Sequence, residues 1–303
     1  MYEGEYFMQK MGNYKDYELL DMANGQKLEK WGGYLLIRPD PQVIWSKKLH
    51  PELWNKADAR YVRSNTGGGH WDVKSKLPDS WMLDFGKLKF NVKPMGFKHT
   101  GLFPEQEVNW VYMMDKIEQQ VQKGEEVKVL NLFAYTGGAT VACLAAGASV
   151  CHVDSSKGMV AWAKENVNSS GLKDAKVRYI VDDVVKFVER EIRRGNTYDA
   201  IIMDPPSYGR GASGEVWNIE RDLENLVMLC TKILSETPLF FAINTYTGGL
   251  SGTVISNLLK ICMEENRADL ITKGHINVNE IGIGVKGSDL ALPCGITTRW
   301  ESK

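Results

Sequence analysis

The chain has 303 residues, 43% of them hydrophobic and 25% charged, which is typical of a globular protein with one large or two ordinary domains. It contains no apolar run long enough to span a bilayer, and its first twenty residues lack the basic and apolar segments of a secretory signal, so we expect no membrane contact. The five cysteines are scattered without a CxxC pair; they give no support to a zinc cluster or a disulfide framework and favour the reducing cytoplasm.

Positive charge is concentrated in one segment. The formal net charge is −1, which speaks against a nucleic-acid partner, but residues 41–100 hold eleven Lys or Arg and five Asp or Glu, a local charge of +6. Aromatic side chains are interleaved with this basic set: Trp45, Trp54, Trp71, Trp81, Phe90 and Phe97 lie among Lys47, Lys48, Lys74, Lys76 and Lys98. Because bases stack on aromatic rings and phosphates bind cations, the mixture suits RNA. The alternative, which composition alone favours, is a small β domain with an aromatic core and solvated lysines.

The first part of the chain is predicted to be β-rich. The expected elements, in chain order, are strands at Tyr17–Leu20 and Tyr34–Arg38 around glycine turns, a flexible loop at Asn65–Gly69, a hairpin of Trp81–Phe85 and Lys89–Val92, and a helix at Glu107–Lys123. Gly124 ends this helix. We therefore predict an N-terminal domain over residues 1–123 and a second domain over residues 124–303.

Short apolar runs then alternate with helical patterns. Strands are expected at Val127–Phe133, Ser149–Val153, Val177–Val181, Ala200–Met203 and Leu239–Ile243, and helices at Thr140–Ala146, Met159–Ser169, Val184–Arg193 and Ile219–Ser235. Two more strands, Leu270–Ile276 and Leu292–Trp300, are expected around the glycine-rich Gly282–Gly287. This alternation predicts an α/β fold, a parallel sheet with helices on both faces. Ligands of such sheets bind at the carboxyl ends of the strands.

Two of these strand ends carry residues suited to an adenosine-like ligand. After the first strand, the loop Asn131–Thr140 contains Gly137 and Gly138, which let the backbone approach a ligand at a helix N-terminus. The loop is neither GxGxxG nor a P-loop, so an ordinary α/β turn is the alternative. Asp154 ends the second strand, where a carboxylate can accept hydrogen bonds from both ribose hydroxyls. The alternative role is a helix N-cap, since two serines follow.

Acidic residues also end the third and fourth strands. Asp182-Asp183 can accept from an adenine amine, with Asp183 favoured, or begin a helix electrostatically. The most specific signal is Asp204-Pro205-Pro206-Ser207-Tyr208, because two prolines make a rigid loop with acceptors and few donors. Such a loop suits a planar base bearing an NH group, with Asp204 and a loop carbonyl accepting its protons and Tyr208 stacking on its face. A purely structural turn is the alternative.

Together with the upstream segment Thr100–Gln106, these motifs resemble the class I methyltransferase family, in the branch of large-subunit ribosomal RNA methyltransferases with N-L-F-x-Y-T-G and D-P-P-[SK]-[FY] loops. The resemblance implies a Rossmann-like, mostly parallel sheet with an antiparallel strand near the C-terminus, and S-adenosylmethionine as cofactor. It implies that Asp204, Pro205 and Tyr208 face the acceptor. The residues it implies for cofactor binding are Phe103, Gln106, Ala134, Tyr135, Thr136, Gly137, Asp154, Ser155, Asp182, Asp183 and Asp204.

The chain departs from that branch at two places. Where the upstream motif of these relatives continues with Arg, this chain has Glu107. The relatives that methylate carbon 5 of a pyrimidine carry a nucleophilic cysteine after the fifth strand, whereas here residues 244–249 contain none and Cys230 is expected in a helix core. We therefore predict direct methyl transfer to a nitrogen, or an oxygen, of ribosomal RNA, with Asp204 orienting the acceptor and taking its proton and with no metal.

Two other functions remain open from the sequence. One is a methyltransferase acting on a protein or a small molecule, which the overall charge of −1 favours. The other is a nucleotide-binding module or NAD-dependent oxidoreductase, which the absence of GxGxxG opposes. The sequence does not indicate the oligomeric state.

Overall fold

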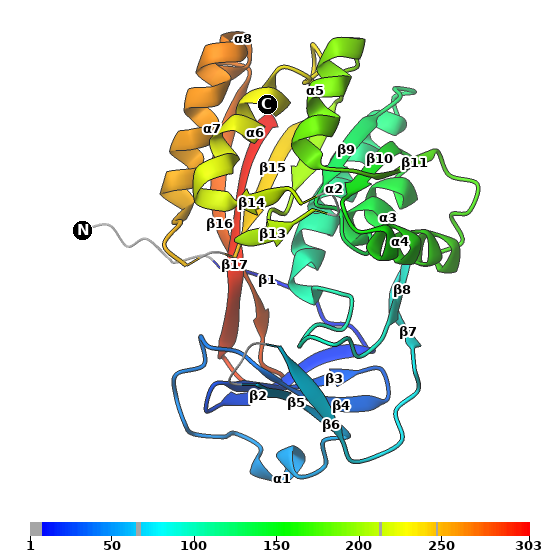
Figure 1. Ribbon diagram of the computed structural model, residues 1–303, viewed down its shortest axis with the longest axis vertical. Coiled ribbons are helices and arrows are strands. Elements are labelled where there is room, and N and C mark those ends of the chain that lie inside the picture. Colours follow the sequence, from blue (N-terminus) through cyan, green and yellow to red (C-terminus); the bar gives the residue numbers. More distant parts are fainter. Residues whose placement is uncertain (1–7, 65–67, 212–213, 247) are drawn as a thin grey trace. The chain divides into compact units, whose positions relative to one another are not determined.

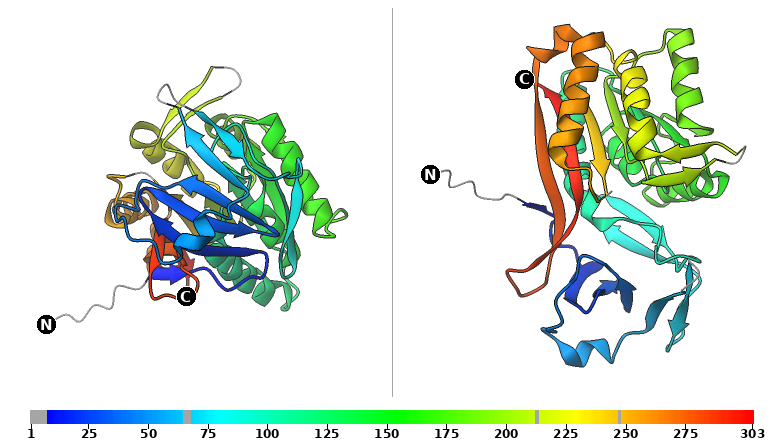
Figure 2. Two further views of the ribbon diagram at one scale, coloured as in Figure 1. Left: turned by 90° about the horizontal axis from the view of Figure 1, so that it is seen from below. Right: turned by 60° about the vertical axis from the view of Figure 1, so that its left-hand side comes forward.

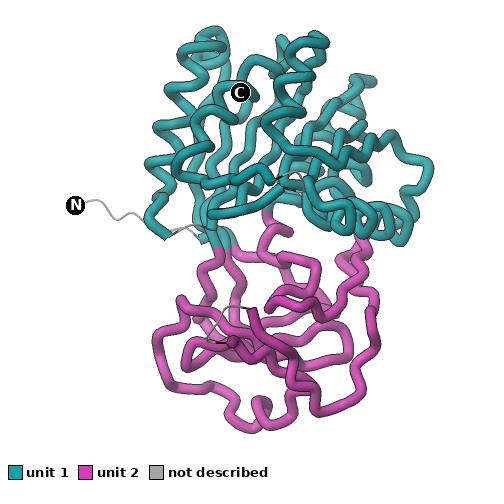
Figure 3. Tube along the Cα trace, in the orientation of Figure 1, with its two compact units in different colours: residues 1–9, 109–281, 295–303 teal, residues 10–108, 282–294 magenta. Residues whose placement is uncertain are grey.

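The computed structural model describes residues 8–64, 68–211, 214–246 and 248–303. These residues form two compact units, coloured separately in Figure 3. Unit 1 contains residues 8–9, 109–281 and 295–303, and unit 2 contains residues 10–108 and 282–294. The boundary between these two units does not lie after residue 123. The division of the chain into domains 1–123 and 124–303 stays a prediction from the sequence.

Unit 1 is built on an eight-stranded sheet (Figure 1). Its strand order is β1-β16-β17-β15-β12-β9-β10-β11. The strands are β1 (Met8–Lys10), β9 (Lys128–Leu132), β10 (Ser149–Asp154), β11 (Val177–Val181), β12 (Ala200–Met203), β15 (Phe240–Thr245), β16 (Gly274–Gly284) and β17 (Ala291–Ser302). From β15 to β11 all neighbours are parallel, and β17 pairs antiparallel with β15. The predicted fold class, mostly parallel with an antiparallel C-terminal part and a β-rich N-terminal part, is confirmed.

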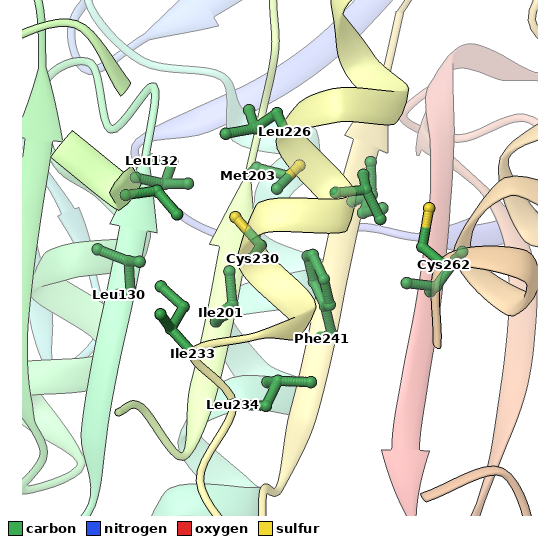
Figure 4. Close-up of a cluster of buried hydrophobic side chains, with 14 of the residues drawn as sticks. Leu130, Leu132, Ile201, Met203, Leu226, Cys230, Ile233, Leu234, Phe241 and Cys262 are labelled. Carbon is green, nitrogen blue, oxygen red and sulfur yellow. The ribbon is translucent and has the colours of Figure 1, made fainter. Parts of the chain in front are cut away.

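Helices cover both faces of this sheet because the central strands are apolar on both sides. The helices are α2 (Glu107–Val121), α3 (Gly138–Ala145), α4 (Lys157–Ser169), α5 (Val184–Arg194), α6 (Ile219–Thr231), α7 (Gly252–Asn266) and α8 (Ala268–Ile271). On one face, Leu130, Ile201 and Phe241 of the strands belong to a buried cluster with Cys230 of α6 and Cys262 of α7 (Figure 4). No helix in the described part of the chain is long and apolar enough to cross a membrane.

The structure corrects several predicted elements of unit 1. Helix α6 ends at Thr231 instead of Ser235, because Tyr198 forms backbone hydrogen bonds with Ile233 and Ser235. The predicted strand Leu270–Ile276 is wrong at its start, where α8 forms; β16 begins at Gly274, where a side chain would collide with the backbone of Glu301. The glycine-rich connection is also shorter than predicted, since β16 continues to Gly284. Strands β16 and β17 run side by side (Figure 2).

Unit 2 contains a five-stranded sheet and a separate hairpin. The sheet has the order β2-β3-β4-β5-β6, and β7 pairs with β8. Its elements are β2 (Tyr17–Ala23), β3 (Gln26–Trp31), β4 (Tyr34–Pro39), α1 (Pro51–Trp54), β5 (Ala59–Arg63), β6 (Gly69–Val73), β7 (Trp81–Phe85), β8 (Leu88–Val92) and the 3-10 helix η1 (Pro104–Gln106). The predicted loop Asn65–Gly69 lies partly outside the described residues, and Gly69 belongs to β6.

A buried ionic cluster stabilises the unit 2 sheet. The carboxylate of Glu29 in β3 is fully buried and receives hydrogen bonds from Arg38 in β4 at 2.6 and 2.7 Å and from the Tyr17 hydroxyl in β2 at 2.8 Å. Although burial alone would raise it, the charges of Arg38 and Lys27 lower the pKa of Glu29 to about 2. Three neighbouring strands are thus joined by charge-assisted hydrogen bonds inside the core.

Candidate functional site

The predicted strand-end residues lie along one edge of the unit 1 sheet. Met203, Leu132 and Val153 are register neighbours on β12, β9 and β10, and Asp154 is the register neighbour of Val181 on β11. Because these strands are parallel, the residues that follow them leave the sheet at the same edge. Neighbouring strands are ~4.8 Å apart, so the edge from β12 to β11 is roughly 14 Å long. The structure therefore brings the four predicted loops together in the order Asp204, Phe133–Gly137, Asp154, Asp182-Asp183.

The loop after β9 has an unusual backbone. Phe133, Tyr135 and Gly137 adopt positive φ angles of 53°, 51° and 83°. The described part of the chain has only one further non-glycine residue with positive φ, Asn24. A left-handed conformation is costly for residues with a side chain and is concentrated at functional sites. The strain is held by hydrogen bonds within unit 1, since the Ala134 amide donates to the Val153 carbonyl at 3.1 Å.

Close helix packing explains the glycines that end this loop. A Cβ atom at Gly137 would lie 2.9 Å from the Cβ of Ala163 in α4, and one at Gly138 would lie 2.7 Å from the ring of Trp110 in α2. Helix α3 therefore starts in contact with two other helices. Gly137 is the N-cap residue of α3 and provides no side-chain hydrogen bond to the first amides of the helix. Because α3 starts directly after this loop, the positive end of its dipole lies at the site edge.

Asp154 joins two of the loops. Its Oδ2 accepts a hydrogen bond from the Tyr135 amide and its Oδ1 accepts one from the Ser156 amide, both at 2.8 Å. Burial raises the pKa of this carboxyl above its ordinary value. Each carboxylate oxygen has two lone-pair positions, so Asp154 retains the capacity to accept from two further donors. The helix N-cap itself is Ser156, which accepts from the Met159 amide, and Ser155 lies half-buried between them.

Asp182 and Asp183 have different surroundings. Asp183 is the N-cap of α5, its Oδ1 accepting from the Lys186 amide at 3.0 Å, which is the alternative that its position allowed. Asp182 accepts from the Asp183 amide and forms an ion pair with Arg190. Both acids therefore begin α5 electrostatically, and one oxygen of Asp183 is taken by the cap.

The Asp204–Tyr208 loop follows β12 and leads into a hairpin that the sequence did not predict. The hairpin consists of β13 (Tyr208–Arg210) and β14 (Val216–Asn218) and precedes α6 (Figure 1). Trp217 of β14 donates from its indole nitrogen to the Pro206 carbonyl at 2.7 Å, and the Ile219 amide donates to the Ser207 carbonyl at 3.1 Å. Pro205 is buried and Asp204 half-buried, whereas Tyr208 is 53% exposed. The backbone of the loop is thus held by Trp217 and Ile219, while the Tyr208 side chain is exposed to solvent.

The upstream residues Phe103 and Gln106 belong to unit 2. Phe103 is the N-cap of η1 and packs its ring 5.2 Å from that of His99; Gln106 is buried at the end of η1. Glu107, where the resembling branch has Arg, accepts hydrogen bonds from the Gly12 amide at 3.0 Å and from the Tyr14 hydroxyl at 2.5 Å. The replacement of Arg by Glu107 therefore has a structural reason, because the Glu107 carboxylate binds the Gly12–Tyr14 segment at the start of unit 2.

Buried polar side chains support the site edge from inside unit 1. Asn131 of β9 donates to the Thr140 hydroxyl at 3.0 Å, and that hydroxyl lies 2.9 Å from Nδ1 of His152 in β10. Burial lowers the pKa of His152 to about 4, so the imidazole is neutral near pH 7. At the end of β15, Asn244 accepts from Asn109 of α2 at 3.0 Å. The sequence placed Asn131 and Thr140 in the loop after the first strand but did not predict that buried polar side chains support the backbone here.

Comparison with known proteins agrees with this geometry. A family model described as S-adenosylmethionine-dependent methyltransferase matches residues 65–247, more than half of the chain. A crystal structure of the S-adenosylmethionine-dependent methyltransferase from Agrobacterium tumefaciens is similar with a TM-score of 0.90 and 36% identity, covering 98% of this chain and 94% of that one.

Two curated relatives carry a more specific name. Proteins named ribosomal RNA large subunit methyltransferase K/L are 34% identical over 151 residues in Shewanella baltica and 35% identical over 149 residues in Shewanella frigidimarina. The matches cover 49% and 48% of this chain. The chain spans only 20% of the length of these curated relatives.

Proposed function

Because the chain belongs to the S-adenosylmethionine-dependent methyltransferase family, we propose that it transfers the methyl group of S-adenosylmethionine to a base nitrogen of ribosomal RNA. The predicted enzyme class and cofactor are confirmed by the family match and by the similar Agrobacterium tumefaciens structure. The observation that carries the proposal is the single sheet edge where Asp154, Asp182-Asp183 and the rigid Asp204–Tyr208 loop follow neighbouring strands. The name of the Shewanella relatives supports ribosomal RNA as the acceptor.

The residues along this edge suit the cofactor in their chemistry. We assign the ribose hydroxyls to Asp154 with Ser155, because Asp154 keeps acceptor capacity after binding two amides. Asp183 with Asp182 suits the adenine amine, and the strained loop Ala134–Gly137 at the start of α3 suits the methionyl carboxylate. The roles of Phe103 and Gln106, which belong to unit 2, stay a prediction from the sequence. When bound, the cofactor supplies an electrophilic methyl group on a sulfonium.

The Asp204 loop suits the acceptor base. We assign the NH group of the base to the Asp204 carboxylate and the Pro205 carbonyl, in a loop whose backbone is held by hydrogen bonds from Trp217 to Pro206 and from Ile219 to Ser207. Asp204 orients the acceptor nitrogen and takes its proton as the methyl is transferred. Tyr208, largely exposed, offers a ring on which the base stacks.

The raised pKa values of the cysteine thiols favour a nitrogen acceptor. Methylation at carbon 5 of a pyrimidine requires a cysteine thiolate. Burial raises the pKa of each of the five thiols, to about 12 for Cys143 and to about 11 for Cys262. Cys230 is fully buried in α6, as the sequence predicted. Each thiol therefore resists ionisation, which opposes a cysteine adduct.

Unit 2 supplies cations for RNA. Lys47, Lys56, Arg63, Lys74 and Lys76 are exposed, and no ion pair joins any of them to a carboxylate within the ranges that the structure describes. Unpaired cations bind phosphates with release of counterions. RNA affinity should therefore fall steeply with salt. A salt-insensitive affinity would contradict this part of the proposal.

A direct test is methyl transfer in vitro. The protein is incubated with methyl-labelled S-adenosylmethionine and either protein-free large-subunit ribosomal RNA or intact large subunits. We expect label in RNA, recovered as a nucleoside methylated on a base nitrogen. Asp199→Ala, which alters a carboxylate at the opposite sheet edge, is the control for Asp204→Ala. Label in ribosomal protein instead of RNA would replace the RNA acceptor by a protein, the alternative that the net charge allows.

A further inference from the structure

The β13–β14 hairpin presents two chemically different faces. Its register pairs Tyr208 with Asn218, Gly209 with Trp217 and Arg210 with Val216. Paired residues of antiparallel strands share a face, and successive residues alternate. Trp217 therefore shares one face of the hairpin with its partner Gly209, which has no side chain. Tyr208, Arg210 and Val216 lie on the other face.

The Trp217 face anchors the hairpin to the site. The indole donates to the Pro206 carbonyl at 2.7 Å, and its ring lies 4.9 Å from that of Phe133, which has the strained backbone after β9. A second tether joins Glu215 to Lys186 of α5 at 2.6 Å. The hairpin is thus connected to the loops after β9 and β12 and to the helix after β11.

The opposite face is open to solvent. Tyr208 is 53% exposed, Val216 is 42% exposed, and Arg210 is also exposed. Arg210 donates from Nε to the Tyr208 hydroxyl at 3.1 Å, which directs its guanidinium along this face. Throughout the described ranges, no carboxylate forms an ion pair with Arg210. This face thus carries a cation, an aromatic ring and an apolar side chain, and it begins at Tyr208, the last residue of the loop assigned to the acceptor base.

We propose that this face of the hairpin contacts RNA beside the methylated nucleotide, with Arg210 binding a backbone phosphate and Trp217 acting as the positioning residue. The proposal rests on the proposed function, because it assumes an RNA acceptor at Asp204. A guanidinium on an exposed strand can form two parallel hydrogen bonds to phosphate oxygens. Trp217 acts through Pro206 and Phe133 and has no contact with RNA in this proposal.

Arg210→Gln tests the phosphate contact, with Arg193→Gln as a matched control. Arg193 is exposed in the last turn of α5, at the other end of the helix that begins at the site edge. Binding to protein-free large-subunit ribosomal RNA is measured over a salt series by filter retention. Loss of one phosphate contact should lower the slope of log affinity against log salt by about 0.7–0.9. We expect this change for Arg210→Gln, unchanged binding for Arg193→Gln, and unchanged S-adenosylhomocysteine affinity for both.

Trp217→Phe tests the positioning role, because it keeps an aromatic ring beside Phe133 and removes the donor to Pro206. We expect kcat to fall about fivefold because the acceptor loop is no longer held in place, with KM for RNA and S-adenosylhomocysteine affinity unchanged and the melting temperature lowered only by the few degrees that one hydrogen bond contributes. A parallel loss of melting temperature and cofactor affinity would make Trp217 merely structural and overturn its role.

The outcomes separate this inference from the function it rests on. RNA methylation by the unaltered protein, combined with equal salt slopes for Arg210→Gln and Arg193→Gln, would overturn the phosphate contact and leave the proposed function intact. An unaltered protein that neither binds nor methylates RNA would overturn both.

Discussion

Replacement of Asp154 by Asn tests the cofactor assignment at the residue whose surroundings are best defined. The carboxylate accepts from the backbone amides of Tyr135 and Ser156, both at 2.8 Å. An Asn side chain has one acceptor oxygen, so it keeps one of these bonds and turns an amide donor toward the other. It also lacks the charge that would receive the ribose hydroxyls.

The expected magnitude follows from these contacts. A hydrogen bond to a charged group contributes about 1.5–3 kcal/mol net, so S-adenosylhomocysteine affinity should fall roughly 10- to 100-fold. Isothermal titration calorimetry measures this affinity, and differential scanning calorimetry checks that the variant is folded. Asp199→Asn is the matched control, because Oδ2 of Asp199 accepts the Lys128 amide at 2.8 Å at the amino ends of the strands. The control should bind as the unaltered protein does.

The same residue predicts a pH dependence of binding. Burial raises the pKa of Asp154 above its ordinary value of 3.8. Only the carboxylate can accept from two hydroxyls, so affinity for S-adenosylhomocysteine should be full well above this raised pKa and fall as the pH drops through it. Asp154→Asn should lack this dependence. A folded Asp154→Asn variant that binds within twofold of the unaltered protein would refute the assignment.

Three further predictions concern the acceptor loop, the glycine turn and the unit 2 core. Asp204→Ala should abolish methyl transfer while S-adenosylhomocysteine binding survives in calorimetry; normal turnover would remove Asp204 from the mechanism. Gly137→Ala should lower the unfolding free energy more than Gly171→Ala, because both have positive φ but only Gly137 faces a neighbour at 2.9 Å; equal losses in urea unfolding would contradict this. Glu29→Ala should cost about 3–5 kcal/mol by leaving a buried arginine unpaired. The stability supplied by Glu29, whose pKa is lowered to about 2, should be present above pH 4.5 and lost as the pH falls toward 2.

The sequence predicted the parts of the molecule in which local pattern and tertiary structure agree. The central strands of unit 1 are short apolar runs, and each ends at a polar residue that leaves the sheet. Asp154 and Asp204 could therefore be placed at strand ends, and parallel pairing brings them to one edge. Asp183 could be placed too, although the structure gives it the N-cap role that the sequence left open.

The features that the sequence did not predict depend on contacts between residues far apart in the chain. Strand β3 was missed because the charged Glu29 is buried at its centre next to the buried Leu28, so the strand shows no alternation of polar and apolar residues; the partner that compensates the buried charge, Arg38, lies on β4. Glu107 finds Tyr14, 93 residues away, as its partner. Trp217 carries no local signal of its role, since its carbonyl partner Pro206 is reached only when the hairpin folds back.

Nucleoside mass spectrometry of ribosomal RNA from a strain lacking the gene tests most directly whether this chain methylates a base nitrogen of ribosomal RNA. We predict the loss of one base-N-methylated nucleoside, restored by the unaltered gene and not by a gene encoding Asp204→Ala. An unchanged modification map, or the loss of a 5-methylpyrimidine instead, would contradict the account.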